Sequence, residues 1–353
     1  MRFFKTTRGI RHRKNRPKGT LPEANQLPTM MENIEEYVKQ LSSNRDVVGI
    51  TLAGGLSRGY GDQLSEIDLN LYLNEDRLQD WIKGRGPLPQ GDHKGTKFHM
   101  DVSFLNLKAE STTDWSLLKK WDASYTKVLY DPTDIIEKFL DSKDVFTAEE
   151  KYSIALGNYL DCVYFGDIVV HQWLLRGDPL VANQMISKGI PALCNLLFLA
   201  NDEYPPFEKW LVNYSYTLHW TPTDWKKRLG AITLIKELTA EEVQRRSREF
   251  MQLYREVWGK IVGEEYYETG LLELDALDVI LYVIREQPTL EEFKKNYDIK
   301  QLSYENLYKL ADIKRINGVE HIVFDPQRFK DEQKKGFPGF LQWNREMLKH
   351  IDI

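Results

Sequence analysis

Ala53-Gly-Gly-Leu-Ser-Arg-Gly-Tyr-Gly-Asp-Gln-Leu-Ser-Glu-Ile-Asp-Leu69 is the stretch of sequence that decides the fold. It continues an apolar run from Val47 to Ala53, which is typical of a buried strand that enters a tight turn. The pair Gly54-Gly55 lets the backbone approach a ligand closely and leaves its N–H groups unblocked. Apolar and polar residues then alternate over positions 67–73, which predicts a half-buried strand.

The acidic residues of this region are in phase with the predicted strands. Glu66 and Asp68 are two positions apart, so on a strand both carboxylates point to one face while Ile67 points into the core. A further strand is predicted over 98–104, and it carries Asp101 on its polar face. Asp101 is therefore the expected third carboxylate, with Asp114 as the alternative in a less strand-like setting.

Three carboxylates beside a glycine turn form a set of oxygen ligands that suits Mg²⁺. Two Mg²⁺ ions held in this way would activate an attacking oxygen and stabilise a leaving pyrophosphate. Ser57 and Arg58 add a hydroxyl group and a cation, both suited to a polyphosphate. The sequence therefore predicts metal ligands at Glu66, Asp68 and Asp101, and nucleotide contacts at Gly54, Gly55, Ser57 and Arg58.

This arrangement resembles the signature of the DNA-polymerase-β nucleotidyltransferase superfamily. The signature is a hydrophobic residue, Gly, then Gly or Ser, a spacer, and an acid–hydrophobic–acid triplet. Here these are Ala53, Gly54, Gly55, a ten-residue spacer and Glu66-Ile67-Asp68. The motif covers about seventeen residues, and the superfamily pattern extends loosely to about residue 140.

The order of the domains resembles aminoglycoside and lincosamide nucleotidyltransferases, in which a helical domain follows the catalytic one. Arg176-Gly-Asp, Tyr204-Pro-Pro and Lys209-Trp210 further resemble elements of uncharacterised bacterial members of the superfamily. Two positions depart from the usual pattern: Glu66 stands where Asp is usual, and Gly55 stands where Ser is frequent. Archaeal CCA-adding enzymes have a similar Glu-Ile-Asp triplet, and Ser57 is placed to replace the missing hydroxyl.

The resemblance implies Mg²⁺-dependent transfer of a nucleoside monophosphate, AMP from ATP, onto a hydroxyl of a small molecule such as an aminoglycoside, with release of pyrophosphate. It also implies a carboxylate base on the first helix of the second domain. Asp161 and Asp167 lie there in the otherwise apolar run Tyr159 to Trp173, although Asp167 and His171 are spaced to pair with each other. Lys209 is expected to reach the triphosphate, with an ordinary surface lysine as the alternative.

Three other functions remain open on the sequence. A protein-AMPylating enzyme of the toxin–antitoxin type would modify a Tyr, Ser or Thr hydroxyl of a protein acceptor. A non-catalytic module would bind the nucleotide without turnover. RNA tailing is favoured only by the first eighteen residues, which contain eight Lys and Arg and no acid.

The predicted fold class is α+β. We expect a basic disordered tail over 1–29, a small mixed-sheet nucleotidyltransferase domain over 30–140, an α-helical bundle domain over 141–262, and a mostly helical extension over 263–353. Thr147-Ala-Glu-Glu150 reads as a capping box that starts a helix reaching about Leu175. Asn317-Gly318 predicts a hairpin turn within the extension.

Composition restricts the partners and the compartment. The net charge is −5 despite the basic first segment, so the remaining chain is acidic, which argues against a broad nucleic-acid surface. We find no run of eighteen apolar residues and expect no membrane contact. Cys162 and Cys194 lie in apolar helical sequence, which predicts buried thiols and a cytoplasmic location. The seven histidines show no zinc-ligand spacing, and the oligomeric state is not indicated.

Overall fold

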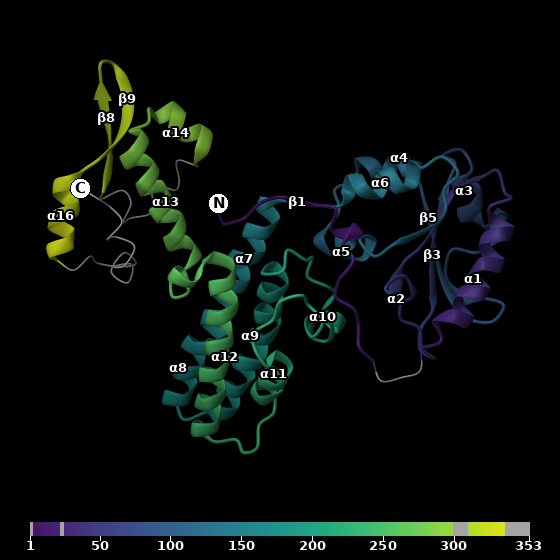
Figure 1. Cartoon of the computed structure of the whole chain (residues 1–353), viewed down its shortest axis with the longest axis horizontal. Coiled ribbons are helices and arrows are strands. Elements are labelled where there is room, and N and C mark those ends of the chain that lie inside the picture. The colour runs from purple at the N-terminus through teal and green to yellow at the C-terminus, as the bar shows by residue number, and fades with distance from the viewer. Residues whose placement is uncertain (1–2, 22–24, 299–309, 336–353) are drawn as a thin grey trace. The chain divides into compact units, whose positions relative to one another are not determined.

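The computed structural model describes residues 3–21, 25–298 and 310–335. The chain divides into two compact units, Arg2–Val257 and Trp258–Ile353. The predicted nucleotidyltransferase and helical domains therefore belong to one unit, and the second unit begins a few residues before the predicted boundary at 263. The fold class is α+β, as the sequence predicts: a mixed sheet with flanking helices is followed by a long helical region (Figure 1).

A five-stranded sheet forms the centre of the first unit, with the strand order β4-β5-β3-β2-β6. Strands β3 and β5 run parallel, and the other neighbours are antiparallel. The strands are β2 (Val47–Leu52), β3 (Ile67–Leu73), β4 (Gly91–Lys94), β5 (His99–Leu105) and β6 (Lys127–Tyr130). The sequence predicts four of them, since Lys127 to Tyr130 also has the pattern of a strand. β4 lies in the Gly/Pro-rich stretch from Gly84 to Gly95, which predicts a loop, because Gly91-Asp-His-Lys94 forms an edge strand without alternating apolar residues.

Successive side chains of β3 point to opposite faces of the sheet, and a separate hydrophobic cluster covers each face. Ile67, Leu69 and Leu71 are buried and pack in one cluster with α1 (Leu27–Leu41), which the helical spacing of its apolar residues predicted. Tyr72 points to the other face and packs with Trp115 and with α6 (Ile135–Lys143). Asp68 and Asn70 are on the same face as Tyr72 and are only partly buried, so part of that face stays polar.

The helical region begins at the predicted capping box. Thr147 accepts from the Glu150 backbone and Glu150 accepts from the Thr147 N–H, which starts α7 (Ala148–Val163). The helix continues through a π-turn into α8 (Val169–Leu175), and both helices pack on α9 (Pro179–Leu199). By length and composition alone, the continuous stretch Ala148–Leu175 is apolar enough to cross a membrane.

Two shorter helices follow, α10 (Glu208–Ser215) and α11 (Trp225–Thr233), and then the long helix α12 (Ala240–Val262). Short helices also connect the strands of the sheet: α2 (Gly54–Ser57), α3 (Leu78–Asp80), α4 (Leu107–Thr112) and α5 (Leu117–Ala123). Cys162 and Cys194 are buried free thiols, as predicted.

The second unit contains the predicted hairpin. β8 (Ala311–Ile316) and β9 (Val319–Phe324) pair antiparallel, and the turn residues Asn317 and Gly318 both have positive φ, as a type I′ turn requires. Helices α13 (Leu271–Glu286), α14 (Leu290–Asn296) and α16 (Pro326–Lys334) make up the rest of what is described. Part of the predicted extension, 299–309 and 336–353, lies outside the described residues.

The expectation of a disordered tail is wrong for residues 3–21. Thr7–Arg8 forms a short strand, β1, with β7 (Val145–Phe146), and Ile10 is fully buried. Arg16 is buried: its guanidinium binds Glu203 at 2.9 Å and the Ser124 carbonyl oxygen at 2.8 Å. The basic side chains of this segment thus meet acids that lie more than a hundred residues away in the sequence, which local composition does not show.

We predict that Arg16→Ala destabilises the protein by roughly 3 kcal/mol, because it leaves the buried Glu203 without its closest cation. Urea denaturation followed by circular dichroism measures the change. Arg8→Ala is the matched control, since Arg8 is exposed on the same segment and forms no ion pair with a described acid. Equal stability of the two variants would contradict the anchoring role of Arg16.

Candidate active site

The turn between β2 and α2 is built against the side chain of Asp68. Gly54 has a φ of 63°, in the left-handed region that disfavours residues with a Cβ. A methyl group at this position would collide with the Asp68 carboxylate. The Ala53 N–H donates to the Asp68 carbonyl oxygen at 2.9 Å, which fixes the turn to the start of β3. The predicted glycine turn therefore lies in direct contact with the predicted acid.

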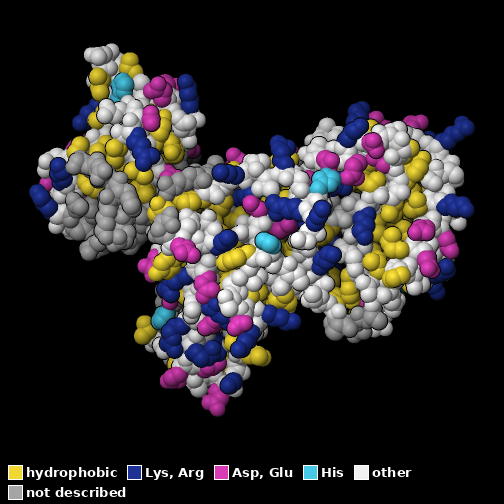
Figure 2. All heavy atoms as spheres, in the orientation of Figure 1, with side chains coloured by type: hydrophobic (Ala, Val, Ile, Leu, Met, Phe, Trp, Pro, Cys, Tyr) yellow, Lys and Arg dark blue, Asp and Glu magenta, His cyan; other side chains and the backbone are white. Residues whose placement is uncertain are grey.

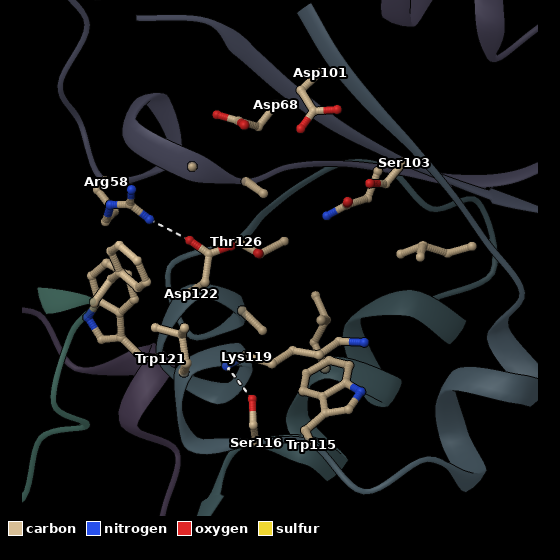
Figure 3. Close-up of a pocket in the computed structure, with 18 of the residues that line it drawn as sticks. Arg58, Asp68, Asp101, Ser103, Trp115, Ser116, Lys119, Trp121, Asp122 and Thr126 are labelled. Atoms are coloured by element: carbon tan, nitrogen blue, oxygen red, sulfur yellow. Dashed lines mark hydrogen bonds and ion pairs between the residues drawn. The ribbon is translucent and has the colours of Figure 1, made fainter. Parts of the chain in front are cut away.

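Asp68 and Asp101 occupy the same level of two neighbouring strands. They are register partners on the parallel pair β3·β5, where strand axes are about 4.8 Å apart. Figure 3 shows their carboxylates close together on one wall of a cavity. Glu66 immediately precedes β3 and is exposed. Among the described residues, no three-carboxylate cluster forms here within 4.8 Å, so Glu66 has to turn inward to share an ion with Asp68.

The loop that leads to Glu66 is organised around Asp62. Its carboxylate accepts from the Tyr60 hydroxyl at 2.5 Å, from the Ser65 hydroxyl at 2.9 Å and from the Leu64 backbone N–H at 2.9 Å. These bonds, that of Tyr60 above all, lower the pKa of Asp62. Asp62 is therefore ionised and holds the loop, and it leaves Glu66 at the mouth of a second cavity of about 300 Å³.

Burial above all, and then the nearby carboxylates of Glu66, Asp122 and Asp101, raise the pKa of Asp68 to about 7, although Arg58 lowers it. The surroundings of Asp68 thus disfavour its charged form. A cation bound close to the carboxylate would stabilise that form, so the site is suited to a cation.

Arg58 is the cation closest to this cluster. Its guanidinium pairs with Asp122 at 2.5 Å and lies over the ring of Trp121, 4.7 Å from the centroid. Figure 3 shows the Arg58–Asp122 pair beside Asp68, with Trp121 beneath the guanidinium. The side chain of Arg58 is buried, so the ion pair and the aromatic ring hold it in one orientation.

The cavity has a volume of about 590 Å³ and mixes aromatic and charged side chains. Trp115 and Lys119 lie on the wall away from the acids, and both bind Glu110. The residues that give the cavity its character are Asp68, Asp101, Asp122, Arg58, Lys119, Lys209, Tyr72, Trp115, Trp121, Phe207 and Trp210. Rings beside carboxylates suit a cyclic ligand that is polar or cationic.

Lys209 lines the large cavity and also the smaller one, together with Gly54, Arg58, Asp68 and Trp210. Gly55 and Glu66 line the smaller cavity as well. The predicted nucleotide-binding residues Gly54, Gly55, Arg58 and Lys209 are therefore brought together with the acids.

Three expectations about individual residues need correction. The Ser57 hydroxyl donates to the Gly54 carbonyl oxygen at 2.8 Å and lines neither of these cavities, so it braces the turn. Asp161 is exposed on α7, and Asp167 pairs with His171 at 2.9 Å. Neither Asp161 nor Asp167 lines the cavity that holds Asp68, because those faces of the helix are turned elsewhere. The alternative third acid, Asp114, is exposed and outside the cavity.

Sequence reasoning missed Asp122, which lies in the cavity where a base was expected from α7 or α8. It belongs to α5, a helix of seven residues that Ser116 caps. The sequence predicts an acid on a short helix to be an ordinary solvated residue. The ion pair between Asp122 and Arg58 depends on the tertiary structure. The one signal was the aromatic neighbour Trp121, since buried Trp next to charge is frequent in binding sites.

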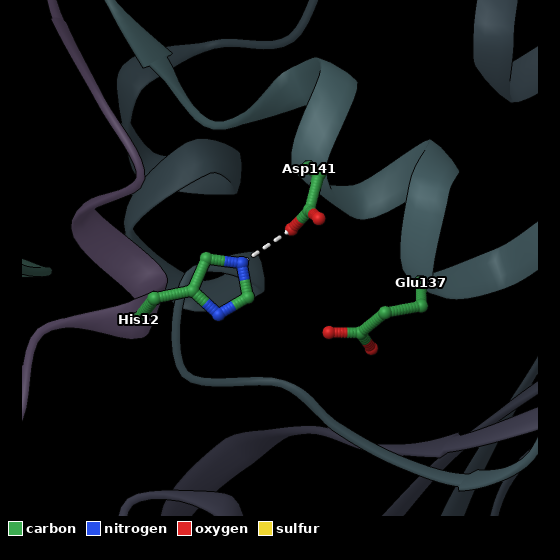
Figure 4. Close-up of side chains that lie close together, drawn as sticks. All are labelled: His12, Glu137 and Asp141. Atoms are coloured by element: carbon green, nitrogen blue, oxygen red, sulfur yellow. Dashed lines mark hydrogen bonds and ion pairs between the residues drawn. The ribbon is translucent and has the colours of Figure 1, made fainter. Parts of the chain in front are cut away.

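A separate group of possible metal ligands lies outside this cavity. His12, Glu137 and Asp141 place one ligand atom each within 4.8 Å of the others (Figure 4). The Arg11 guanidinium already lies 2.7 Å from both Glu137 and Asp141. Its charge offsets part of that of the two acids, and His12 bonds Asp141 as well, so this group joins the N-terminal segment to α6 without a metal.

The residues at the glycine turn fit a divalent cation. The ligand set is carboxylate oxygen, which hard ions such as Mg²⁺ prefer. Burial and the neighbouring carboxylates disfavour the charged form of Asp68 and raise its pKa, and a bound cation would stabilise that form. Asp68 and Asp101 would hold the ion, and Glu66 would join them.

Comparison with known proteins gives little beyond this geometry. No family model and no curated protein matches the chain. Among solved structures, the chain is similar to a nucleotidyltransferase-like protein from Exiguobacterium sibiricum 255-15, with 13% sequence identity and a TM-score of 0.38. The match covers 84% of this chain and 99% of that one. At this TM-score the likeness is too weak to carry an argument.

We predict that Gly54→Ala lowers the free energy of unfolding more than Gly59→Ala does. Both glycines have positive φ, but only Gly54 would bring a Cβ against Asp68, whereas a Cβ at Gly59 meets no atom within 4 Å. Backbone strain costs each variant about 1 kcal/mol, and the collision should add 1 kcal/mol or more at Gly54 only, on the order of an overpacked core. Urea denaturation measures the difference, and identical losses would contradict the contact.

A second prediction concerns pH. The folded state holds a proton on Asp68 up to about pH 7, whereas the unfolded state releases it near the ordinary pKa of 3.8. The metal-free protein should therefore lose stability as the pH rises from about 4 to about 7. Asp68→Asn, which cannot ionise, should gain at least about 1 kcal/mol on the wild type between pH 5 and pH 8. Denaturation in EDTA at both values tests this, and a constant difference would refute the raised pKa.

Proposed function

We propose that this protein is a divalent-metal-dependent nucleotidyltransferase that moves a nucleoside monophosphate, AMP from ATP, onto a hydroxyl of a small molecule. The observation that carries the proposal is the register pair Asp68 and Asp101, set against the Gly54 turn. It places two carboxylates beside a backbone that approaches closely and beside two cations, Arg58 and Lys209. This combination suits a polyphosphate and its metal ions, and it has no comparable use in a purely structural core.

Each group then has a role in the transfer. Glu66, Asp68 and Asp101 would hold the metal ions; when bound, such ions activate the attacking oxygen and stabilise the leaving pyrophosphate. Lys209 and Arg58 contact the triphosphate from the side of the smaller cavity. The acceptor oxygen forms a bond to the α-phosphorus, the α–β phosphoanhydride bond breaks, and pyrophosphate leaves. Asp122 orients the acceptor hydroxyl and takes its proton.

The cavity supports a small acceptor rather than a protein. It is concave, about 590 Å³ in volume, and within the size range of small-molecule sites. Its aromatic rings and the carboxylate of Asp122 suit an amino sugar, whose ammonium groups are attracted to acids. An aminoglycoside-like antibiotic is the acceptor that we propose. Protein AMPylation and nucleotide binding without turnover are the competing outcomes of the experiment below.

We predict that the wild type, incubated with Mg²⁺, α-labelled NTP and a panel of aminoglycosides, releases pyrophosphate and labels the acceptor in equal amounts. Asp68→Asn should lower turnover roughly a thousandfold, because a charge that binds metal in the transition state is lost. Asp122→Asn should lower it roughly a hundredfold, as loss of a general base does. Asp114→Asn is the matched control and should leave turnover unchanged.

The possible outcomes separate the candidate functions. If the label appears on a protein and on no small molecule, the protein AMPylates a protein acceptor and does not modify a small molecule. A Mg²⁺-dependent rise in melting temperature with ATP, without pyrophosphate release, would leave only the binding module. Wild-type turnover in folded Asp68→Asn would refute the site itself.

A further inference from the structure

A third cavity, of about 330 Å³, lies on the other side of Arg58, and the charged side chains of its lining are all basic. The lining includes Arg13, Lys14, Lys18, Arg58 and Lys127, and no described residue in it is acidic. Elsewhere the signs are mixed: Figure 2 shows Lys, Arg, Asp and Glu interspersed over the face of the protein that it draws. A concave surface with charge of one sign concentrates the field and attracts ions of the opposite sign.

Part of this positive charge is already used by the fold. Arg16 binds Glu203, and Arg11 binds Glu137 and Asp141, so these two guanidinium groups anchor the N-terminal segment. Lys14, Lys18 and Lys127 differ from them, because they are exposed and form no ion pair with a described acid. Three ammonium groups therefore remain available to a ligand at the rim of the cavity.

Two guanidinium groups in the lining also have an unused donor. The Nε–H groups of Arg11 and Arg58 are buried and have no hydrogen-bond partner among the described residues, although other nitrogens of both side chains are paired. Buried donors without a partner are uncommon in native proteins and ask for an explanation. A bound anion in this cavity would give these donors a partner, since the guanidinium group is suited to oxyanions.

We propose that this basic cavity binds a small phosphate anion of the size of inorganic phosphate or pyrophosphate. The cavity is small, with a volume of about 330 Å³, which fits an ion of this size better than a nucleic-acid strand, whose site would be an extended groove. The body of the chain is acidic, which also opposes a long polyanion. The site is distinct from the proposed metal site, because neither Asp68 nor Lys209 lines it.

Arg58 and Thr126 line both this cavity and the large one. A bound anion would compete with Asp122 for the guanidinium of Arg58. Occupancy of the basic cavity is thereby coupled to the Arg58–Asp122 ion pair. The binding proposal itself does not depend on the catalytic assignment, since it rests on the lining alone.

The test is isothermal titration of pyrophosphate and of inorganic phosphate into the full chain, in EDTA and at low salt. We expect one site for pyrophosphate, which the triple variant Lys14→Gln, Lys18→Gln, Lys127→Gln weakens at least tenfold. The control triple variant Lys39→Gln, Lys83→Gln, Lys94→Gln removes the same charge from exposed lysines outside the cavity and should bind like the wild type. Asp68→Asn should also bind, because the metal site is not involved.

Three outcomes would overturn the proposal. The first is the absence of binding by either anion. The second is an equal loss in both triple variants, which would mean that only the net charge matters. The third is tight binding of a single-stranded oligonucleotide that needs the same three lysines while pyrophosphate does not bind. Because the substituted lysines are all exposed, melting curves should show that each variant is folded.

Discussion

The close approach of the Gly54 backbone to the Asp68 carboxylate is the constraint on which the rest of the site depends. A Cβ at position 54 would collide with the Asp68 carboxylate, so the turn could lie against β3 only if that side chain moved away. The bond from the Ala53 N–H to the Asp68 carbonyl oxygen holds the turn at this place. That contact brings the C-terminal end of β2 to the level at which Asp68 and Asp101 are paired. It also places Arg58, four residues after Gly54, where it reaches both Asp122 and the acids. One backbone conformation therefore gathers the carboxylates and their cation.

Arg58 contacts an acidic side chain, an aromatic ring and a basic cavity. It neutralises Asp122, lies over Trp121, and borders the basic cavity built by the N-terminal segment. That segment is held in place by buried ion pairs such as Arg16 with Glu203, which are strong only when both partners stay together. The same basic residues that resemble a solvated tail in the sequence thus help to form the wall behind the proposed active site.

The acids and the turn could be predicted because their information is local. The two-residue period of Glu66-Ile67-Asp68 and the alternation around Asp101 specify which side chains share a face. Asp122 could not be predicted, because its approach to Arg58 depends on how α5 packs against the sheet. The apolar run Tyr159–Trp173 correctly indicated a helix, but periodicity does not say which neighbour the polar positions face, so Asp161 and Asp167 were misplaced. The edge strand β4 lacked any apolar pattern.

The central claim is that Asp68 and Asp101 hold the metal of a nucleotide-bound complex. It is tested most directly by a crystal structure of the protein with Mn²⁺ and a non-hydrolysable ATP analogue, in which anomalous scattering locates the ions. The account predicts Mn²⁺ within ligand distance of both carboxylates, with the triphosphate between Lys209 and Arg58. Mn²⁺ bound only at His12, Glu137 and Asp141, or a nucleotide bound outside the cavity of Asp68, would contradict it.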